Sequence, residues 1–316
     1  NAAHYSLIQW NATNELLSIH PVVQQVIRDE LTHEQQEQYI QKVILALNAI
    51  FPKEEEINFG SRKILRNCDR LSPHCLQALE WIKEFSILDS EAASLIHKTG
   101  CYLFIRCRYD EAEEFYQEAL KIRRKLFAEN KEAQKELDVA SSLNNLAELK
   151  EIRALYHEAE PLFDEALKIR QNRLSSSDHY LVGQSLHNLA RLYFHLGRYV
   201  EAKKYYQEAL EINESNLEAK KTILPKDFLK NFLARSYNDI AKLYVALAQY
   251  DEAEKYYQKA LSINKKILGE NNLQYASNLD NLGDVYLAQG FADQAEDYYS
   301  QAFNIRSSYL KGDDYN

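Results

Sequence analysis

The sequence predicts an all-α protein whose C-terminal two-thirds form a solenoid of about five helical hairpins. Three observations support this prediction. Gly and Pro, which interrupt helices, number only 8 and 5 among 316 residues. Ala, Leu, Glu, Lys and Gln, which favour helices, are abundant. A motif also recurs at intervals of 42 to 51 residues, and a period of this length is typical of repeat arrays.

Charge and hydropathy exclude several classes of partner. The formal charge of -9 argues against nucleic acid, because binding phosphates requires a basic face, although a local basic patch stays open. No stretch reaches the roughly 18 apolar residues that a membrane span needs, and the N-terminus lacks a secretory signal pattern. The four cysteines are too few for a disulfide framework. We therefore expect a cytoplasmic protein with free thiols and neither nucleic acid nor membrane as a partner. Its oligomeric state is left open.

The first ninety residues differ from the rest and predict a helical connector. Residues 5–19 hold two apolar segments around a polar turn, a pattern typical of a β-hairpin. Pro21 is a favourable first residue for a helix, and the apolar face of that helix would carry Val22, Val23, Val26 and Ile27. Thr32 and Gln35 form a capping-box pattern that opens the next helix, which ends near Pro52. Shorter helices are expected at about 61–70 and 73–86.

The repeat motif forms the second helix of each hairpin. Its four clearest copies are YDEAEEFYQEALKI (109–122), YHEAEPLFDEALKI (156–169), YVEAKKYYQEALEI (199–212) and YDEAEKYYQKALSI (250–263), and a fifth is ADQAEDYYSQAFNI (292–305). The equivalent alanines are Ala112, Ala159, Ala202, Ala253 and Ala295. A preceding helix supplies a small residue, at Gly100, Ala147, Ala190, Ala241 and Gly283. The small residues are expected where the two helices approach closely, and the aromatic residue three or four positions after each alanine is expected to fill the gap between hairpins.

These segments resemble the tetratricopeptide repeat, in particular the 42-residue type of kinesin light chains and many bacterial regulators. The resemblance covers about residues 91–306 and implies a right-handed superhelical solenoid. It divides the chain into a connector at 1–90 and an array at 91–316. The hairpins are expected at about 91–126, 138–172, 181–217, 233–267 and 275–309. The connections at 123–138 and 213–232 are long, and we expect the second helix of the hairpin to extend into each.

Residues 5–31 (YSLIQWNATNELLSIHPVVQQVIRDEL) resemble the end of the winged-helix domain of STAND-type signalling ATPases of the NB-ARC kind. This resemblance implies that a nucleotide-binding part lies upstream. The chain itself has no G-x-x-x-x-G-K loop to hold phosphates, so no nucleotide or other cofactor is predicted to bind it.

Metal binding and catalysis have weak support in the sequence. His97 and Cys101 lie one turn apart, with Cys68, His74 and Cys75 upstream, but the paired cysteines of a structural zinc site are missing. We therefore interpret these side chains as packed or exposed, and predict no metal. No nucleophile motif is present either. The chain is predicted not to be an enzyme, with a hydrolase that uses a histidine or cysteine kept as the weakest alternative.

The first helices of the hairpins carry polar residues at equivalent positions, and the resemblance implies that these helices line a concave groove. An Asn side chain both donates and accepts hydrogen bonds, so a column of Asn suits the main chain of an extended peptide. The predicted groove residues are Lys98, Asn144, Asn145, His187, Asn188, Arg191, Arg235, Asn238, Asp239, Lys242 and Asn281. For any single Asn, a bond between adjacent helices is an equally good interpretation. The complete column favours the groove.

These observations predict a module that binds a protein or peptide and serves as the sensor part of a larger signalling ATPase. A stand-alone scaffold or adaptor is the alternative. The basic groove residues are expected to select acidic groups on the ligand. Since Glu148, Asp239, Asp280 and Asp284 are expected on the same surface, we predict a groove with a basic middle and an acidic C-terminal end.

Overall fold

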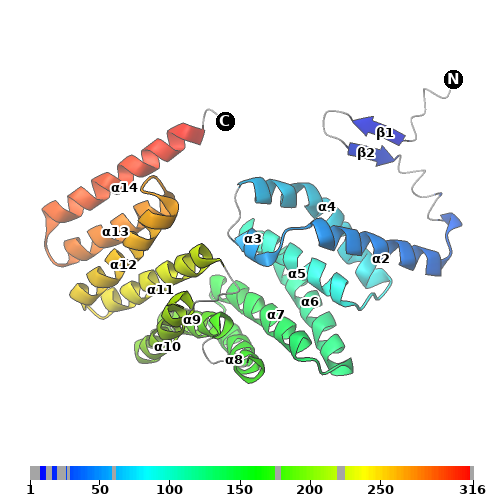
Figure 1. The fold of residues 1–316 in the computed structure, drawn as a ribbon, viewed down its shortest axis with the longest axis horizontal. Coiled ribbons are helices and arrows are strands. Elements are labelled where there is room, and N and C mark those ends of the chain that lie inside the picture. Colours follow the sequence, from blue (N-terminus) through cyan, green and yellow to red (C-terminus); the bar gives the residue numbers. More distant parts are fainter. Residues whose placement is uncertain are drawn as a thin grey trace. The chain divides into compact units, whose positions relative to one another are not determined.

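A computed structural model describes residues 8–11, 16–19, 26, 29–58, 62–174, 179–218 and 225–313. The chain divides into two compact units, Asn1–Asn130 and Lys131–Asn316, which are described separately below. The helical hairpins of both units are seen in Figure 1. The sequence places a domain boundary near residue 90 instead, and that functional division stays a prediction.

The only strands among the described residues form a two-stranded antiparallel hairpin. Strand β1 (Ile8–Asn11) pairs with β2 (Leu16–Ile19), with Ile8 opposite Ile19. The β-hairpin predicted within residues 5–19 is thereby confirmed. Most of the helix predicted from Pro21, with Val22, Val23 and Ile27, lies outside the described residues, as does much of the segment that resembles a winged-helix domain.

The first unit packs three helices against its first hairpin. Helices α2 (His33–Ile50), α3 (Glu54–Asn58) and α4 (Arg62–Glu84) all contact α5 (Ser90–Ile105), which pairs with α6 (Tyr109–Glu129). The capping box at the start of α2 is confirmed, because Thr32 Oγ1 accepts a bond from the Gln35 amide (3.3 Å) and Gln35 Oε1 accepts one from the Thr32 amide (2.9 Å).

Helix α4 corrects the prediction of two short helices at 61–70 and 73–86. It runs without a break through Pro73, which lies exposed on its surface. A proline inside a helix costs about 3 kcal/mol. The opposite face buries a continuous apolar stripe that includes Cys68, Cys75, Leu79 and Ile82, and breaking the helix would expose part of it.

The second unit contains four consecutive helical hairpins. Their helices are α7 (Ala133–Ile152) with α8 (Tyr156–Arg173), α9 (Tyr180–His195) with α10 (Tyr199–Glu218), α11 (Lys226–Ala246) with α12 (Tyr250–Leu268), and α13 (Leu273–Ala288) with α14 (Ala292–Asp313). The second helix of a hairpin also contacts the first helix of the next. With α5–α6, this makes the five predicted hairpins. Helices α6 and α10 extend into the long connections as expected, and α11 begins several residues before its predicted start.

The small residues of the repeat lie where two helices meet. Ala147, Ala190 and Ala241 are completely buried. At Gly283 there is no room even for a methyl group, because a Cβ atom would lie 2.7 Å from the Tyr299 ring. The aromatic residues of the motif, such as Phe163 and Tyr206, are buried in the same cores. The predicted packing inside the hairpins is confirmed.

Each hairpin turns at a residue with positive φ that lies seven positions after the small residue. These residues are Cys107, Ala154, Gly197, Ala248 and Gly290, with φ between 55° and 88°. The left-handed conformation ends the first helix and reverses the chain into the second. Glycine adopts this conformation without strain, whereas Ala154 and Ala248 adopt it at a cost in backbone energy.

Candidate functional site

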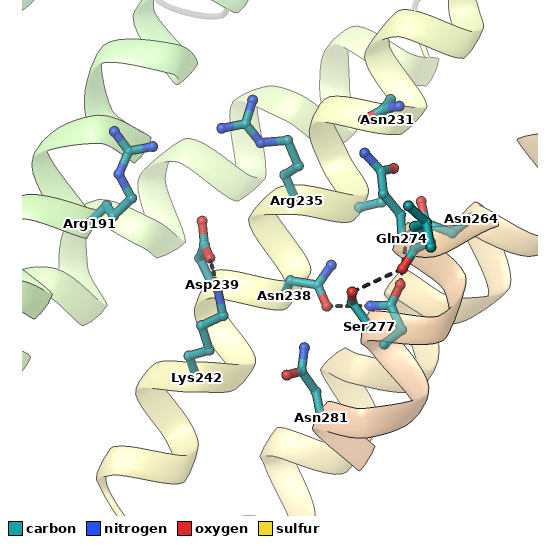
Figure 2. A pocket seen from close by; sticks show the side chains of 13 residues that line it. Arg191, Asn231, Arg235, Asn238, Asp239, Lys242, Asn264, Gln274, Ser277 and Asn281 are labelled. Atoms are coloured by element: carbon teal, nitrogen blue, oxygen red, sulfur yellow. Dashed lines mark hydrogen bonds and ion pairs between the residues drawn. The ribbon is translucent and has the colours of Figure 1, made fainter. Parts of the chain in front are cut away.

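A pocket of about 480 Å³ lies in the second unit between the first helices of neighbouring hairpins. Helices α9, α11, α12 and α13 all contribute to it. Its lining residues are Arg191, Asn231, Ala234, Arg235, Asn238, Asp239, Lys242, Asn264, Leu273, Gln274, Ser277, Asn278 and Asn281. Figure 2 shows the charged side chains of α9 and α11 along one wall and the amide side chains of α13 along the other. Most of the lining residues are therefore polar or charged.

A chain of amide hydrogen bonds holds three helices together at the base of this pocket. Asn264 of α12 donates its side-chain N–H to Asn278 of α13 (2.6 Å), and Asn278 donates to Asn238 of α11 (2.5 Å). Asn264 and Asn278 are both buried. Because a buried amide without a partner would cost free energy, these bonds stabilise the packing of α11, α12 and α13 and fix the shape of the pocket.

The acidic residue of the pocket, Asp239, is paired on both sides. Its carboxylate accepts a hydrogen bond from His187 Nε2 (3.1 Å) and forms an ion pair with Lys242 Nζ (2.9 Å). Burial opposes ionisation, but these two contacts hold the pKa of Asp239 well below its usual range. Burial also lowers the pKa of His187, so its imidazole is neutral and donates Nε2–H to the carboxylate. The negative charge of Asp239 is thus largely compensated within the protein.

Arg191 has its guanidinium engaged by a neighbouring hairpin. It donates two hydrogen bonds to Glu151 of α7, at 2.8 and 2.6 Å, and Glu151 is itself buried. This bidentate pair ties α9 to α7. The charge of Arg191 is therefore compensated by Glu151, and its planar donors are largely used.

Four polar side chains of the pocket remain available for a ligand. Within the described residues, no hydrogen-bond or ion-pair partner is found for the side chains of Asn231, Arg235, Gln274 and Asn281. Arg235 is exposed, and no carboxylate in the described part of the chain forms an ion pair with it. Figure 2 shows Asn231 and Arg235 on α11, and Gln274 and Asn281 on α13. A guanidinium and several amides at one site suit a carboxylate and a peptide main chain.

Six of the predicted groove residues line this pocket: Arg191, Arg235, Asn238, Asp239, Lys242 and Asn281. Asn231, Gln274 and Ser277 were missed. Their signal was present in the sequence, because Asn231 lies one turn before Arg235 on α11, and Gln274 and Ser277 precede Asn281 on the same face of α13.

The other five predicted residues have partners or positions elsewhere. Lys98 belongs to the first unit, where it donates to the carbonyls of Asn48 (2.7 Å) and Phe51 (3.3 Å) at the end of α2. Asn188 and Asn144, both among the predicted residues, are buried and bonded to each other: Asn188 is only 3% exposed and donates to Asn144 (3.0 Å) and to Glu148 (2.7 Å). The remaining two are His187, which is buried against Asp239, and Asn145, which lies half-buried beside Asn144.

These contacts correct the interpretation of the Asn column. Asn144 and Asn188 bond between adjacent hairpins, which is the alternative that the sequence left open for each single Asn. The acidic end of the predicted groove is also paired internally, because Asp280 forms an ion pair with Arg306 and Asp284 accepts a bond from the Tyr299 hydroxyl (2.7 Å).

One group of possible metal ligands occurs among the described residues. Glu54, His97 and Cys101 place their ligand atoms within 4.8 Å of one another, and His97 Nε2 lies 3.0 Å from the Glu54 carboxylate. The pair His97–Glu54 ties α3 to α5. His187, at the equivalent position of α9, makes the same kind of pair with Asp239, so we interpret both as packing contacts. Cys68 and Cys75 are buried, and burial raises the pKa of each thiol to about 11.

Two models of the family described as tetratricopeptide repeat match the chain. One matches residues 138–215 and 232–308, and the other matches residues 93–130, which together is more than half of the chain. No curated protein matches the sequence significantly. Among the described residues, no helix combines the length and hydropathy that crossing a membrane requires.

Solved structures of repeat proteins are similar to the chain. BtubC (BKLC) from P. vanneervenii has 21% identity and a TM-score of 0.57, with 78% of this chain and 91% of that chain covered. The kinesin-light-chain-type TPR-like repeats of Podosopora anserina have 21% identity and a TM-score of 0.50, with coverage of 68% and 95%. NprR in complex with its cognate peptide NprX has 16% identity and a TM-score of 0.56, with coverage of 90% and 74%. The chain belongs to the tetratricopeptide repeat family, and it shares the helical solenoid fold of kinesin-light-chain-like repeat proteins.

Proposed function

We propose that the chain binds an extended peptide segment of a partner protein in the pocket between α9, α11 and α13, and that Arg235 binds a carboxylate of that segment. The observation that carries the proposal is the set of four uncommitted polar side chains, Asn231, Arg235, Gln274 and Asn281, on facing walls of one pocket. The three amides would hydrogen-bond to the main chain of the peptide, whatever its side chains are.

The charges of the pocket favour an anionic group. Asp239 is compensated by Lys242, and Arg191 by Glu151, so the exposed Arg235 leaves a local positive site in a chain of net charge -9. A carboxylate on Arg235 gains a charge-assisted hydrogen bond, which is stronger than a neutral one. The peptide-bound NprR has a similar fold and supports a peptide as the class of ligand.

The test is a selection from a random peptide library displayed on phage, followed by affinity measurement for the selected peptides. We expect selected sequences to carry Asp, Glu or a free C-terminal carboxylate. Arg235→Ala should weaken their binding at least about tenfold, because a hydrogen bond to a charged group contributes about 1.5–3 kcal/mol. Lys204→Ala removes an exposed cation from α10 and serves as the matched control. Equal losses for the two variants, or selection of peptides without carboxylates, would place the binding site elsewhere.

We further propose that this binding module is the sensor of a signalling ATPase, with a stand-alone scaffold as the alternative. The support is the resemblance of residues 5–31 to the end of a winged-helix domain. The two functions differ in one measurable property of the natural gene product. A sensor would change the rate of ATP hydrolysis when a selected peptide binds, and Arg235→Ala would remove that response. A scaffold would bind the same peptide without any such effect.

A further inference from the structure

Three side chains of the first unit bring different metal-binding atoms together. Glu54 of α3 offers a carboxylate oxygen, while His97 and Cys101 of α5 offer an imidazole nitrogen and a sulfur, and these atoms all lie within 4.8 Å of one another. His97 and Cys101 are one turn apart, so helix geometry places them on the same face of α5. Glu54 lies 43 residues before His97 in the sequence, and only the fold brings it to this face.

The third side chain distinguishes this set from the similar pair in the second unit. His187 occupies the position of His97 in α9 and pairs with Asp239. One turn later α9 carries Arg191, a cation that cannot bind a metal ion, whereas α5 carries Cys101. Among the described residues, the set in the first unit is the one that combines three possible metal ligands. A histidine–carboxylate contact is therefore shared by the two hairpins, but the sulfur ligand is not.

The charges of the set suit a divalent cation. When a metal ion binds, the thiol of Cys101 releases its proton to solvent and binds as a thiolate. The carboxylate of Glu54 supplies a second negative charge, and His97 binds as a neutral imidazole. These two charges balance those of the ion. The site then carries no net charge, which matters because His97 and Cys101 are both buried.

The donor types and distances favour zinc. Zn²⁺ is bound by sulfur, nitrogen and oxygen ligands, whereas Mg²⁺ and Ca²⁺ take oxygen ligands. Ligand atoms at about 2.0–2.3 Å from one tetrahedral zinc ion lie about 3.3–3.8 Å from one another. His97 Nε2 and Glu54 Oε2, at 3.0 Å, must separate slightly, and the largest separation in the set must shorten by about 1 Å. The side chain of Glu54 is 30% exposed, so the ion and one water molecule have access to the site.

We propose that Glu54, His97 and Cys101 bind a zinc ion, with water as the fourth ligand, and that the ion joins α3 to α5. Without the ion, the contact between Glu54 and His97 joins the same two helices. The sequence predicts no metal here because it shows His97 and Cys101 without the carboxylate that the fold adds. Since the ion binds the folded arrangement, it raises the stability of the first unit. The proposal does not depend on the peptide pocket, whose residues belong to the second unit.

Cobalt(II) and zinc are the probes, added to the complete chain after metal has been removed with a chelator. Co²⁺ bound by a thiolate gives a charge-transfer band in the near-ultraviolet, and zinc should displace it. Isothermal titration calorimetry near neutral pH, in buffers of different ionisation enthalpy, should show release of about one proton for each zinc ion bound, because the thiol ionises.

Glu54→Gln separates metal binding from packing. The glutamine amide oxygen still accepts the hydrogen bond from His97, so α3 stays packed on α5, whereas a neutral amide is a poor zinc ligand. We expect the affinity for zinc to fall at least about tenfold. Glu55→Gln removes an exposed carboxylate from the same helix and is the matched control. Saturating zinc should raise the melting temperature of the wild type and of the control, but not that of Glu54→Gln.

A second pair of variants tests the sulfur ligand. Cys101→Ser should remove the cobalt charge-transfer band, while Cys107→Ser, which removes an exposed thiol, should keep it. The proposal is overturned if the wild type shows no such band, or if Cys101→Ser keeps the band and Cys107→Ser loses it. Equal affinity of Glu54→Gln and Glu55→Gln for zinc would also overturn it, because the bound ions would then be adventitious ions at the surface.

Discussion

Ala248 ends α11 in a left-handed backbone conformation with φ of 55°, at a position where the hairpin between α9 and α10 has Gly197. A non-glycine residue in this conformation costs about 1–2 kcal/mol, and part of that cost is offset because glycine loses more entropy on folding. We predict that Ala248→Gly raises the free energy of unfolding by up to about 1 kcal/mol, measured by denaturant titration.

Gly197→Ala is the reciprocal control for this prediction. A Cβ atom at Gly197 would meet no other atom within 4 Å, so the variant changes the backbone preference alone. It should lower the stability by about the amount that Ala248→Gly gains. If both variants leave stability unchanged, the left-handed turn is not a source of strain.

His187 links the stability of the second unit to pH. Burial lowers the pKa of its imidazole below 6.5, while Asp239 opposes this shift and the nearby Arg191 and Arg235 reinforce it. The unfolded chain therefore binds a proton that the folded chain does not as pH falls through 6.5, and stability decreases with falling pH. We predict that the melting temperature falls between pH 7 and pH 5, and that His187→Gln makes this fall smaller.

For His187→Gln, the informative quantity is the slope of the melting temperature against pH, rather than the melting temperature itself. Burial also lowers the pKa of His179, so part of the dependence should survive in the variant. An identical slope in both proteins would show that His187 becomes protonated in the folded state.

At the level of single residues, the sequence predicted only part of the candidate site. Counting from the small residue Ala241 correctly placed Asn238, Asp239 and Lys242 at the pocket, because helix geometry determines which positions share a face. It could not distinguish Asn281, whose amide faces the pocket, from Asn188, whose amide is used between hairpins. That distinction depends on whether Glu148 and Asn144 lie within hydrogen-bonding distance, which is a tertiary contact.

Among the helices, those that carry the repeat motif were predicted best. Their apolar spacing and small residues set both the existence and the packing of each hairpin, and the structure agrees within a few residues. Helix α4 was predicted poorly, since Pro73 is a strong local signal for a break and the buried stripe that outweighs it becomes visible only against α5. The early start of α11 was missed because residues 226–232 lie outside the motif.

The contact between α9 and α10 gives a test of hairpin packing. Ala202 is completely buried in the core that the two helices share with their neighbours. We predict that Ala202→Leu lowers the free energy of unfolding by about 1–3 kcal/mol, because three additional carbon atoms must displace neighbouring side chains.

The control for this variant is Lys204→Leu, whose side chain is 70% exposed in the wild type. Lys203, its neighbour, is unsuitable because it is half-buried and contacts the Tyr244 ring. Both variants add a leucine to the same helix, so a difference in stability reports on burial. Equal melting temperatures would mean that the hairpin interface tolerates a larger side chain at this position.

In the second unit as a whole, stability should follow the order of the hairpins, because each hairpin contacts only its neighbours. The free energy of such an array is approximately a sum of nearest-neighbour terms. The hairpin α13–α14 packs on α12 through α13, and its other face leaves Phe303, Leu287 and Phe291 exposed. It therefore has fewer stabilising contacts than α9–α10, which has a hairpin on each side.

We predict that amide hydrogen exchange is fastest at this end, with residues 275–313 exchanging before residues 139–212. Mass spectrometry of pepsin fragments would measure the order. Faster exchange in residues 139–212 than in residues 275–313 would show that nearest-neighbour packing does not govern the stability of this unit, because the best-connected hairpins would then open first.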